Sequence, residues 1–366
     1  MYLEDWYTQR TLNDPLFLTT QVLRDKTMCI MGGCGQVGSH TVTKLYEFGF
    51  PIENIYVNDN LALGRLENLP VSLRDRVDRR PHLEFARDPQ CKPGIVIFVG
   101  GRSSAPHFKS LTDVMEEIET WKANVEWCVA EKIRLIFAST SSLCKVRPSV
   151  ETQRVWPGSL YELTKLMMEE MAIQQALCED LVVQICRFFS VYGVTEQHKG
   201  NSGNLYTQIL WHAKKGVPFE VWGQKGVFKP GDQTRDTIFA TEVARAILFL
   251  LTLPDPKPTL DDISSLTYNI GQGRPVSVQE MIAQVSAVLD TAPQIVETDV
   301  PREVKNYVID TWGNPEKLLQ AGFKPMFTDH IANLRFINRA LTELGWYWST
   351  VETIRSSLMR KAQANC

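Results

Sequence analysis

A turn with glycines spaced three residues apart constrains the fold of this chain more than any other feature. The apolar run 28–31 stops at a turn that contains Gly32, Gly35 and Gly38, and a helical pattern follows from Val37 onward. This order predicts a strand, a tight turn and a helix. Glycine leaves the backbone amides at the helix N-terminus open to an anion, which the helix dipole also favours. The turn therefore predicts the diphosphate site of a dinucleotide, with a plain glycine-rich turn as the alternative.

An acidic residue follows at the spacing that a dinucleotide site requires. The next strand begins at Ile55 and ends at Asp59, about twenty residues past the last glycine, where a carboxylate meets the adenosine ribose hydroxyls. NADP needs a basic residue near this point, and the nearest arginine, Arg65, lies several residues further on. Asp59 therefore favours NAD, with a turn-forming aspartate at a strand end as the alternative.

Size, charge and composition indicate an ordinary globular protein with one large core or two smaller ones. The chain has 366 residues, of which 44% are hydrophobic and 22% charged, and a net charge of −3 at pH 7. This charge gives no electrostatic reason to expect nucleic acid or an anionic membrane as a partner. No apolar run reaches the ~18 residues that span a bilayer, and the N-terminus lacks the layout of a signal peptide. We expect a cytoplasmic protein that binds neither nucleic acid nor membranes.

The cysteines indicate neither a metal site nor a disulfide framework. None of the eight cysteines forms a C-x-x-C pair, and they do not cluster with the six histidines. Several of them, such as Cys29, Cys128 and Cys186, lie in apolar runs, where a buried free thiol is the ordinary state. We therefore expect no bound metal.

Apolar strands and helical patterns alternate along the first half of the chain. We expect strands at 28–31, 55–59, 83–86, 94–99, 133–138 and 181–186, and helices at 111–130 and 159–177. Most of these strands are apolar on both faces, which is typical of a parallel sheet covered by helices on each side. The predicted fold class is α/β, with a Rossmann-type doubly wound parallel sheet.

Past Arg187 the alternation loosens, and a smaller mixed α/β domain is expected. We expect helices at 205–215, 277–289 and 330–344 and a short strand at 219–222, whereas 241–253 resembles a helix of the first domain. The predicted division is an N-terminal extension at 1–26, a dinucleotide-binding domain at 27–190 with 236–255 returning to it, and a second domain at 191–235 and 256–366. The extension is rich in aromatic residues, so it is expected to pack on the body or on a second subunit.

Tyr161 and Lys165 lie four residues apart, one turn from each other on the same face of a helix. A cation at this spacing stabilises phenolate and lowers the pKa of a tyrosine from about 10 towards neutrality. The helix follows a strand that ends at Ser139, Thr140 and Ser141, at the sheet edge where open α/β folds bind ligands. A hydroxyl there can bond the oxygen that the tyrosine deprotonates. The alternatives are a surface pair on a helix and a plain serine-rich turn.

Together these motifs resemble an extended short-chain dehydrogenase/reductase of the nucleotide-sugar epimerase/dehydratase family, most closely UDP-glucose 4-epimerases and UDP-glucuronate decarboxylases. The resemblance runs from about residue 27 to 325 and includes four further motifs, at 59–64, 187–193, 233–236 and 268–273. It implies NAD as cofactor, a nucleoside-diphosphate sugar as substrate and a homodimer. In relatives the dimer pairs the helices expected at 111–130 and 159–177, on which Met167, Met168 and Met171 can face a partner or the core.

The resemblance also implies roles for individual residues. Tyr161 removes a proton from a sugar hydroxyl with the help of Thr140, the nicotinamide takes a hydride from the same carbon, and Lys165 also binds the nicotinamide ribose. The cofactor site is expected to include Gly32, Gly35, Gln36, Val37, Gly38, Asp59, Asn60, Asp88, Gly100, Gly101, Asn124, Tyr161, Lys165 and Phe188. The substrate site is expected to include Ser103, Ser104, Ser141, Ser190, Asn204, Glu220, Trp222, Arg235 and Arg302. The two arginines match residues that hold the nucleotide diphosphate, with surface salt bridges as the alternative.

Two departures from the family pattern bear on the reaction. Gly100 and Gly101 replace alanines, and 88–94 is too short for the usual helix, so the cofactor pocket is expected to be thin on this side. Ser141 and Ser142 replace the acidic residues of dehydratases and decarboxylases. Without a carboxylate, elimination lacks its acid and base, which favours epimerisation, most simply 4-epimerisation through a transient 4-keto sugar. The alternatives are a decarboxylase, a 4,6-dehydratase, a 4-keto reductase, an epimerase at another carbon and, least favoured, a non-catalytic NAD-binding subunit.

Overall fold

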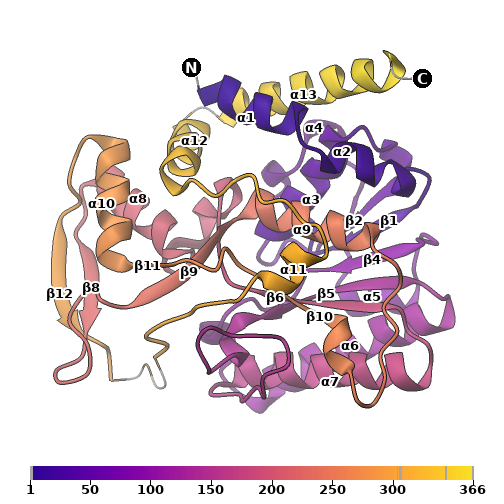
Figure 1. Ribbon diagram of the computed structural model, residues 1–366, viewed down its shortest axis with the longest axis horizontal. Coiled ribbons are helices and arrows are strands. Elements are labelled where there is room, and N and C mark those ends of the chain that lie inside the picture. The colour runs from indigo at the N-terminus through magenta and orange to yellow at the C-terminus, as the bar shows by residue number, and fades with distance from the viewer. Residues whose placement is uncertain (1–2, 303, 305–306, 343, 365–366) are drawn as a thin grey trace.

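A parallel sheet of seven strands forms the centre of the molecule (Figure 1). The computed structural model describes residues 3–302, 304, 307–342 and 344–364. The strands are β1 (Met28–Met31), β2 (Ile55–Asn58), β3 (Val77–Asp78), β4 (Ile95–Phe98), β5 (Arg134–Thr140), β6 (Val183–Phe188) and β10 (Thr267–Ile270). They lie in the order β10-β6-β5-β4-β1-β2-β3, and all neighbours are parallel. The order reverses between β1 and β4, the position at which open α/β sheets bind ligands in a crevice at the carboxyl ends of the strands.

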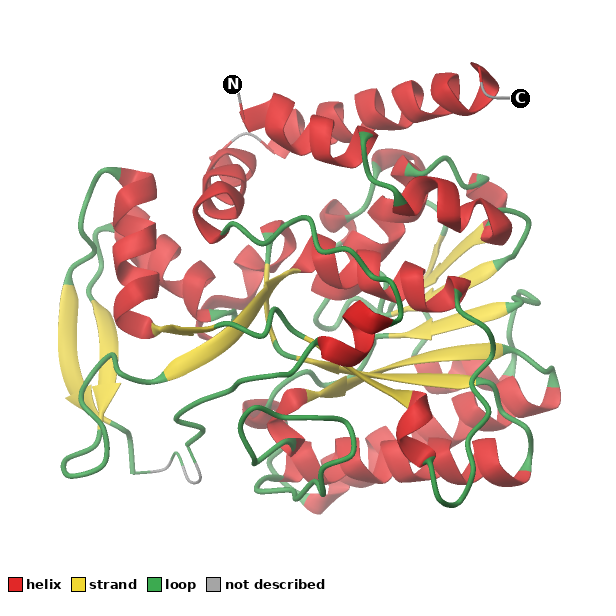
Figure 2. Ribbon diagram, in the orientation of Figure 1, coloured by secondary structure: helices red, strands yellow, loops and turns green. Residues whose placement is uncertain are grey.

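Helices cover both faces of this sheet (Figure 2), so the predicted α/β class with a doubly wound sheet is confirmed. On one face lie α3 (Gln36–Glu47) and α9 (Ala240–Thr252), and on the other lie α5 (His82–Arg87), α6 (Leu111–Ala130) and α7 (Leu160–Cys178). Successive side chains of a strand point to opposite faces. In β4, Ile97 therefore joins the core beneath α3 and α9, and Val96 joins the core beneath α6 and α7.

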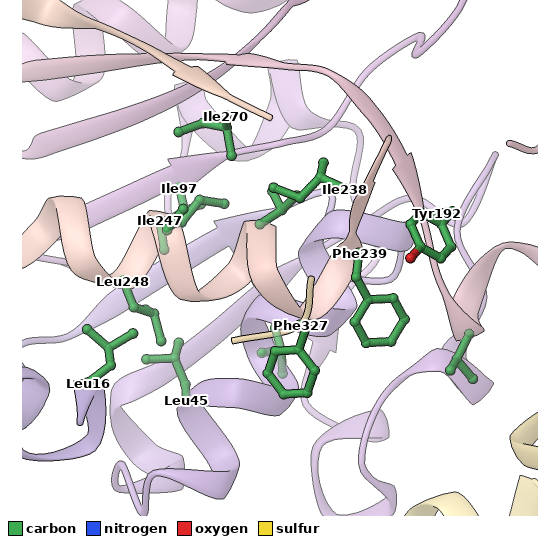
Figure 3. Packing of buried hydrophobic residues seen from close by; sticks show 14 of the residues in the cluster. Leu16, Leu45, Ile97, Tyr192, Ile238, Phe239, Ile247, Leu248, Ile270 and Phe327 are labelled. Atoms are coloured by element: carbon green, nitrogen blue, oxygen red, sulfur yellow. The ribbon is translucent and has the colours of Figure 1, made fainter. Parts of the chain in front are cut away.

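The larger core lies between the sheet, α3 and α9. Figure 3 shows Ile97 of β4, Ile247 of α9 and Leu45 of α3 within this cluster, and all three are fully buried. The N-terminal extension, with α1 (Leu3–Leu12) and α2 (Leu16–Thr19), packs on the same side. Asp14 of the extension forms a buried 2.6 Å ion pair with Arg245 of α9. The extension therefore packs on the body of the chain, one of the two positions expected for it.

The second region combines two small sheets with helices. One sheet has the order β11-β9-β7, and the other pairs β12 with β8 in parallel. The strands are β7 (Ser190–Tyr192), β8 (Phe219–Gly223), β9 (Thr234–Phe239), β11 (Pro275–Ser277) and β12 (Ile295–Asp299). Besides α9, the helices that follow α7 are α8 (Leu205–Lys215), α10 (Val278–Leu289), α11 (Glu316–Gln320), α12 (His330–Thr342) and α13 (Leu344–Ala364). The last helix returns to lie on α1 and α3 (Figure 1).

The structure differs from the sequence prediction at three elements. One is α13, expected within the second domain, which packs on α1 and α3 instead. Residues 83–86, expected as a strand, lie in the helix α5, which starts after Pro81 and carries the chain from β3 back to β4. The segment 88–94 is too short for a helix, as expected, and the helix lies directly before it, at His82–Arg87. Residues 267–270, expected in the second domain, form β10 beside β6 in the large sheet. Within the described ranges, no helix is both long and apolar enough to cross a membrane.

Candidate active site

The glycine turn between β1 and α3 has no room for side chains. Gly32 has a φ of +82°, and a Cβ on it would lie 2.4 Å from the Cα of Gly100. A Cβ on Gly38 would lie 2.1 Å from the carbonyl oxygen of Gly32. The helix begins at Gln36, and its N-cap residue Gly35 brings no side chain to its first amides. The positive end of the helix dipole is therefore open to a phosphate, and the turn fits a dinucleotide diphosphate.

Asp59 lies beside this turn, directly after β2. Its side chain accepts hydrogen bonds from the amides of Cys34 at 2.9 Å and Leu61 at 2.8 Å. A carboxylate has lone pairs left after these two bonds, so Asp59 can still accept ribose hydroxyls at this edge. The following residue, Asn60, is exposed and accepts a hydrogen bond from the amide of Ala62 at 3.1 Å.

A second glycine turn, after β4, is filled by side chains from other elements. A Cβ on Gly100 would lie 2.2 Å from Nε2 of His82, the first residue of α5. Gly101 has a φ of +93°, and a Cβ on it would lie 2.5 Å from a carboxylate oxygen of Glu117 on α6. The expectation that the missing alanines thin the pocket is therefore wrong, because an imidazole and a carboxylate occupy the space.

Both of these side chains are held in place. Nδ1 of His82 lies 2.6 Å from Oδ1 of Asn58, and the amide nitrogen of Asn58 donates to two carbonyl groups. Nδ1 therefore carries the proton, and burial lowers the pKa of His82, which keeps the ring neutral. Glu117 forms a 3.2 Å ion pair with Arg102. No motif pointed to His82 or Glu117, because only the fold brings them to the end of β4.

Tyr161 lies in the first turn of α7 and contacts the end of β5. Its phenol lies near the hydroxyl group of Thr140, the last residue of β5. The ring of Phe108 packs near it, with 5.9 Å between ring centroids. Burial raises the pKa of Tyr161 above its ordinary value, and the nearby hydroxyl group of Thr140 acts in the opposite direction. Without a ligand the pKa is therefore raised, not lowered as the spacing to Lys165 suggested, because burial outweighs the effect of Thr140.

Lys165 lies one turn further along α7 and points to the same strand. Its ammonium group donates a 2.9 Å hydrogen bond to the carbonyl oxygen of Ala138 and lies 5.0 Å from the ring centroid of Phe137. Burial lowers the pKa of Lys165 to about 8, while the negative charges of Glu117 and Glu169 act in the opposite direction. The lysine is therefore mostly protonated at neutral pH and loses its proton at slightly alkaline pH.

A buried ion pair supports the strand ends behind Lys165. Glu169 of α7 accepts two hydrogen bonds from Arg187 of β6, at 3.0 and 2.7 Å. The hydroxyl group of Ser139 also donates to Glu169. Because these residues come from α7, β6 and β5, the pair fixes α7 against the two strands. Glu169 lies four residues after Lys165, a spacing that the sequence analysis did not use.

Three further residues were expected to bind the cofactor, and the contacts described for them are not with the glycine turn, Tyr161 or Lys165. Asn124 is fully buried and donates to the carbonyl of Thr120 at 2.8 Å, while its Oδ1 has no partner within the described residues. Phe188 ends β6 and is half-buried. Asp88 follows α5 with an 80% exposed side chain, so the structure does not gather it at the crevice. Asp78 lies closer, because its carbonyl accepts the amide of Asp59 at 2.9 Å.

The expected substrate residues fall into two groups, the first of which follows the ends of β4, β5 and β6. Ser141 is buried directly after Thr140. Ser190 accepts a 2.9 Å hydrogen bond from the side chain of Asn204, which caps α8 through the amide of Tyr206. After β4, Ser104 lies 3.3 Å from the ring of His107, and its neighbour Ser103 is exposed.

The second group lies around β8. Tyr307 brings two of its members together, because its ring lies 5.5 Å from that of Trp222 and its hydroxyl oxygen accepts a 3.3 Å hydrogen bond from Arg235. Arg235 also donates to backbone carbonyls, and Nε1 of Trp222 is buried without a partner in the described part of the chain. Glu220 and Arg302 are exposed. Tyr307 is a member of this group that the sequence analysis missed.

Three comparisons relate the chain to known proteins. The sequence model of the NAD dependent epimerase/dehydratase family matches residues 28–271. An ADP-L-glycero-D-manno-heptose-6-epimerase of Nitratidesulfovibrio vulgaris (strain DP4) is 25% identical over 315 residues, which cover 82% of this chain and 93% of that protein. The UDP-glucose 4-epimerase of Thermus thermophilus, solved with NAD, has a TM-score of 0.74 at 22% identity and covers 86% of this chain and 99% of its own. The epimerase Mth375 of Methanothermobacter thermautotrophicus has a TM-score of 0.76 at 18% identity, covering 94% of this chain and 98% of its own.

Proposed function

Since the chain belongs to the NAD dependent epimerase/dehydratase family, we propose that it is a nucleotide-sugar epimerase that works through a transient 4-keto sugar. NAD is its cofactor, and the open glycine turn with Asp59 beside it fits a dinucleotide. The observation that carries the proposal is the position of Tyr161 near Thr140 at the end of β5, one helical turn from Lys165, which points to the same strand.

The residues of this site have complementary tasks in such a reaction. Bound NAD supplies a hydride acceptor that later returns the hydride, so the cycle needs no external oxidant. Tyr161 takes the proton of the sugar hydroxyl and gives it back at the end of the cycle. Thr140 hydrogen-bonds the same oxygen. When Lys165 is protonated, its ammonium group places a positive charge near the phenolate of Tyr161. This charge lowers the pKa of Tyr161 once a bound ligand separates the ammonium group from the carbonyl oxygen of Ala138.

The carboxylates near Tyr161 and Lys165 support epimerisation over elimination. Glu162 accepts hydrogen bonds from Lys145 at 2.7 Å and from the amide of Gly158. Glu117 is paired with Arg102. A carboxylate held by a cation is a weak base, and an elimination needs both an acid and a base at the neighbouring carbon. The dehydratase therefore remains a weaker alternative.

A specific observation favours a second candidate, an epimerase that acts on another carbon of the sugar. The relative from Nitratidesulfovibrio vulgaris is named as a heptose-6-epimerase and matches most of both chains. The same tyrosine, lysine and NAD can oxidise whichever carbon the sugar presents to them. The two candidates thus share their chemistry and differ in how the sugar is seated.

Isotope labelling separates these candidates. The protein is incubated in deuterated water with UDP-glucose, UDP-glucuronate and an ADP-heptose, and the products are followed by NMR. We expect one substrate to reach an equilibrium of two epimers without deuterium from the solvent at the inverted carbon, because the same hydride leaves and returns. A substrate deuterated at the oxidised carbon keeps its label, and the labelled position identifies the carbon.

Other outcomes would contradict the proposal. Deuterium entering from the solvent together with loss of water indicates elimination. Release of carbon dioxide indicates decarboxylation, and net consumption of NADH indicates reduction. If the protein binds NAD and converts none of these sugars or their GDP, dTDP and CDP counterparts, the non-catalytic reading is favoured.

We further propose a homodimer formed through α6 and α7. Leu111 and Met115 lie one turn apart on α6 with 64% and 60% of their surface exposed, while Met167 and Met171 of α7 are half-buried and Met168 belongs to the core. Exposed apolar side chains on paired helices favour a self-association surface. Sedimentation at twice the chain mass of 41.6 kDa supports this interface, and a monomer at all concentrations contradicts it.

A further inference from the structure

A cavity of about 700 Å³ lies beside α7, separate from the candidate active site. Its volume falls within the range of small-molecule sites, roughly 300–1,000 Å³. The walls come from the loop 151–157, from α7 and from the segment 261–267, which contains η7 (Ile263–Leu266). Among the described residues that line it, none belongs to the expected cofactor or substrate site. The cavity therefore has no role in the proposed reaction so far.

One face of α7 forms a wall that is partly apolar and partly acidic. The residues of α7 that line the cavity are spaced by three and four positions, namely Leu166, Glu169, Glu170 and Ile173. This spacing places them on one side of the helix. The loop 151–157 adds Trp156, which is 62% exposed. A bound molecule can therefore contact apolar surface and carboxylates together.

Two buried polar groups of the cavity lining have unused hydrogen-bonding capacity. Arg187 is only 5% exposed, and its Nε and Nη2 donate to Glu169, whereas its Nη1 has no partner in the described part of the chain. Nε2 of Gln153 donates to the carbonyl oxygen of Pro148 at 3.2 Å, while its Oε1 is also without a partner among those residues. An unpaired buried donor or acceptor is costly. A hydroxyl group, which both donates and accepts, can satisfy such atoms.

The lining of the cavity carries an excess of negative charge. Its acidic residues are Glu151, Glu169, Glu170, Asp261 and Asp262, and its basic residues are Arg154 and Arg187. The charge of Arg187 is balanced by Glu169 at 2.7 Å. Lys317 lies next to the wall, with its ammonium group 2.6 Å from the carbonyl oxygens of Ser264 and Thr267, but the acidic residues still outnumber the basic ones. A concave surface of this charge attracts cations.

The exposed indole of Trp156 adds a surface that suits an organic cation. The guanidinium group of Arg154 lies 5.3 Å from the centroid of this ring. The chain therefore already places one cation on the indole, and 62% of Trp156 remains exposed. Among aromatic side chains, tryptophan attracts cations most strongly.

We propose that this cavity binds a small hydroxylated organic amine. Its ammonium group lies beside Trp156 and the exposed carboxylates of Glu170 and Asp261, and a hydroxyl group lies at Arg187 and Gln153. Because Glu169 already balances the charge of Arg187, a neutral hydroxyl group is a sufficient partner there. The ligand thereby contacts the ion pair that fixes α7 against β5 and β6.

Three hexoses that share one skeleton and differ in charge test this proposal. Glucosamine is a cation at slightly acidic pH, glucose is neutral and glucuronate is an anion. Binding of each to the purified protein is measured by saturation-transfer NMR and titration calorimetry. We expect glucosamine to bind with a dissociation constant about threefold or more below that of glucose, and glucuronate to bind most weakly. Added salt should weaken the binding of glucosamine, because it screens the charges.

Matched variants locate the binding in the cavity. Trp156→Leu and Glu170→Gln should each raise the dissociation constant of glucosamine about threefold or more. Trp211→Leu is the control, because Trp211 of α8 is 44% exposed and has Lys215 at 5.9 Å from its ring but does not line the cavity. It should bind glucosamine like the wild type.

Three results would overturn the proposal. They are no binding of glucosamine, tighter binding of glucuronate than of glucosamine, and an affinity for glucosamine that Trp156→Leu and Glu170→Gln leave unchanged. The measurements use neither NAD nor a nucleotide sugar, so their outcome is independent of the proposed epimerase activity.

Discussion

Two glycine turns lie at neighbouring strand ends of the same sheet, and their glycines avoid different kinds of steric clash. In the turn after β1, the Cβ positions that Gly32 and Gly38 lack would collide with backbone atoms. In the turn after β4, the positions that Gly100 and Gly101 lack would collide with side chains that reach in from α5 and α6. The first turn keeps side chains out and leaves space for a ligand, whereas the second uses glycine to let side chains enter.

This difference separates what each turn contributes to the site. The first supplies backbone amides and a helix dipole, which are fixed and carry no titratable group. The second places a neutral imidazole and a carboxylate at the crevice, and the carboxylate of Glu117 influences the pKa of Lys165. Changes in the first turn should therefore abolish cofactor binding, and changes in the second should alter stability and pH dependence.

The largest effect is expected for Gly38→Ala. Its added methyl group lies 2.1 Å from a backbone carbonyl oxygen, which cannot move without opening the turn. We expect loss of bound NAD and a drop in unfolding free energy of about 1–3 kcal/mol or more. Nucleotide content after purification and urea unfolding measure the two effects. Gly35→Ala is the matched control, because its methyl group lies 3.2 Å from the same oxygen and should be tolerated better.

A smaller effect is expected for Gly100→Ala, whose methyl group meets the ring of His82 at 2.2 Å. The clash is with a side chain, so removing that side chain should relieve it. Gly100→Ala alone should lower the unfolding free energy by roughly 1–3 kcal/mol, and much of this loss should disappear when it is combined with His82→Ala. Simply additive losses in the double-mutant cycle would mean that His82 does not fill the turn.

The smallest effect is expected for Glu117→Gln and concerns pH. The negative charge of Glu117 favours protonated Lys165, whose pKa is about 8, so its removal lets Lys165 lose its proton at lower pH. The alkaline limb of kcat/KM should move to lower pH, with little change in the rate well below the limb. Glu116→Gln is the control, because Glu116 pairs with the same Arg102 at 2.8 Å but is 58% exposed. If the alkaline limb lies at the same pH in the wild type and in Glu117→Gln, the charge of Glu117 does not influence the pKa of Lys165.

Features encoded by neighbouring residues could be predicted from the sequence. The doubly wound sheet follows from strands such as β4, whose residues are apolar on both faces. Thr140 and Tyr161 meet because one ends a strand and the other begins the next helix, and parallel strands place such ends at one edge. The family, the fold class and NAD as cofactor are confirmed, whereas the individual binding roles remain predictions.

Features that depend on distant segments could not be predicted in this way. The four residues at 83–86 mix apolar and polar side chains and suit a strand or a helix equally. In the structure they belong to α5, which connects the short strand β3 to β4. The sequence could not show which of Asp88 and Asp78 lies nearer to the expected cofactor site. Only the pairing of β2 with β3 places Asp78 beside Asp59. Lys199 donates a 3.1 Å hydrogen bond to Gln36, the first residue after the glycine turn, although the two residues lie more than 160 positions apart in the chain. No motif in the sequence predicts such a contact.

In the proposed reaction, the phenol of Tyr161 moves the proton of a sugar hydroxyl beside bound NAD. Tyr161→Phe tests it most directly, with nucleotide content and turnover measured on the same preparation once a substrate is known. We predict unchanged NAD content and a fall in turnover of about a hundredfold or more, the usual contribution of a general acid–base group. Turnover equal to that of the wild type, with NAD still bound, would contradict the account.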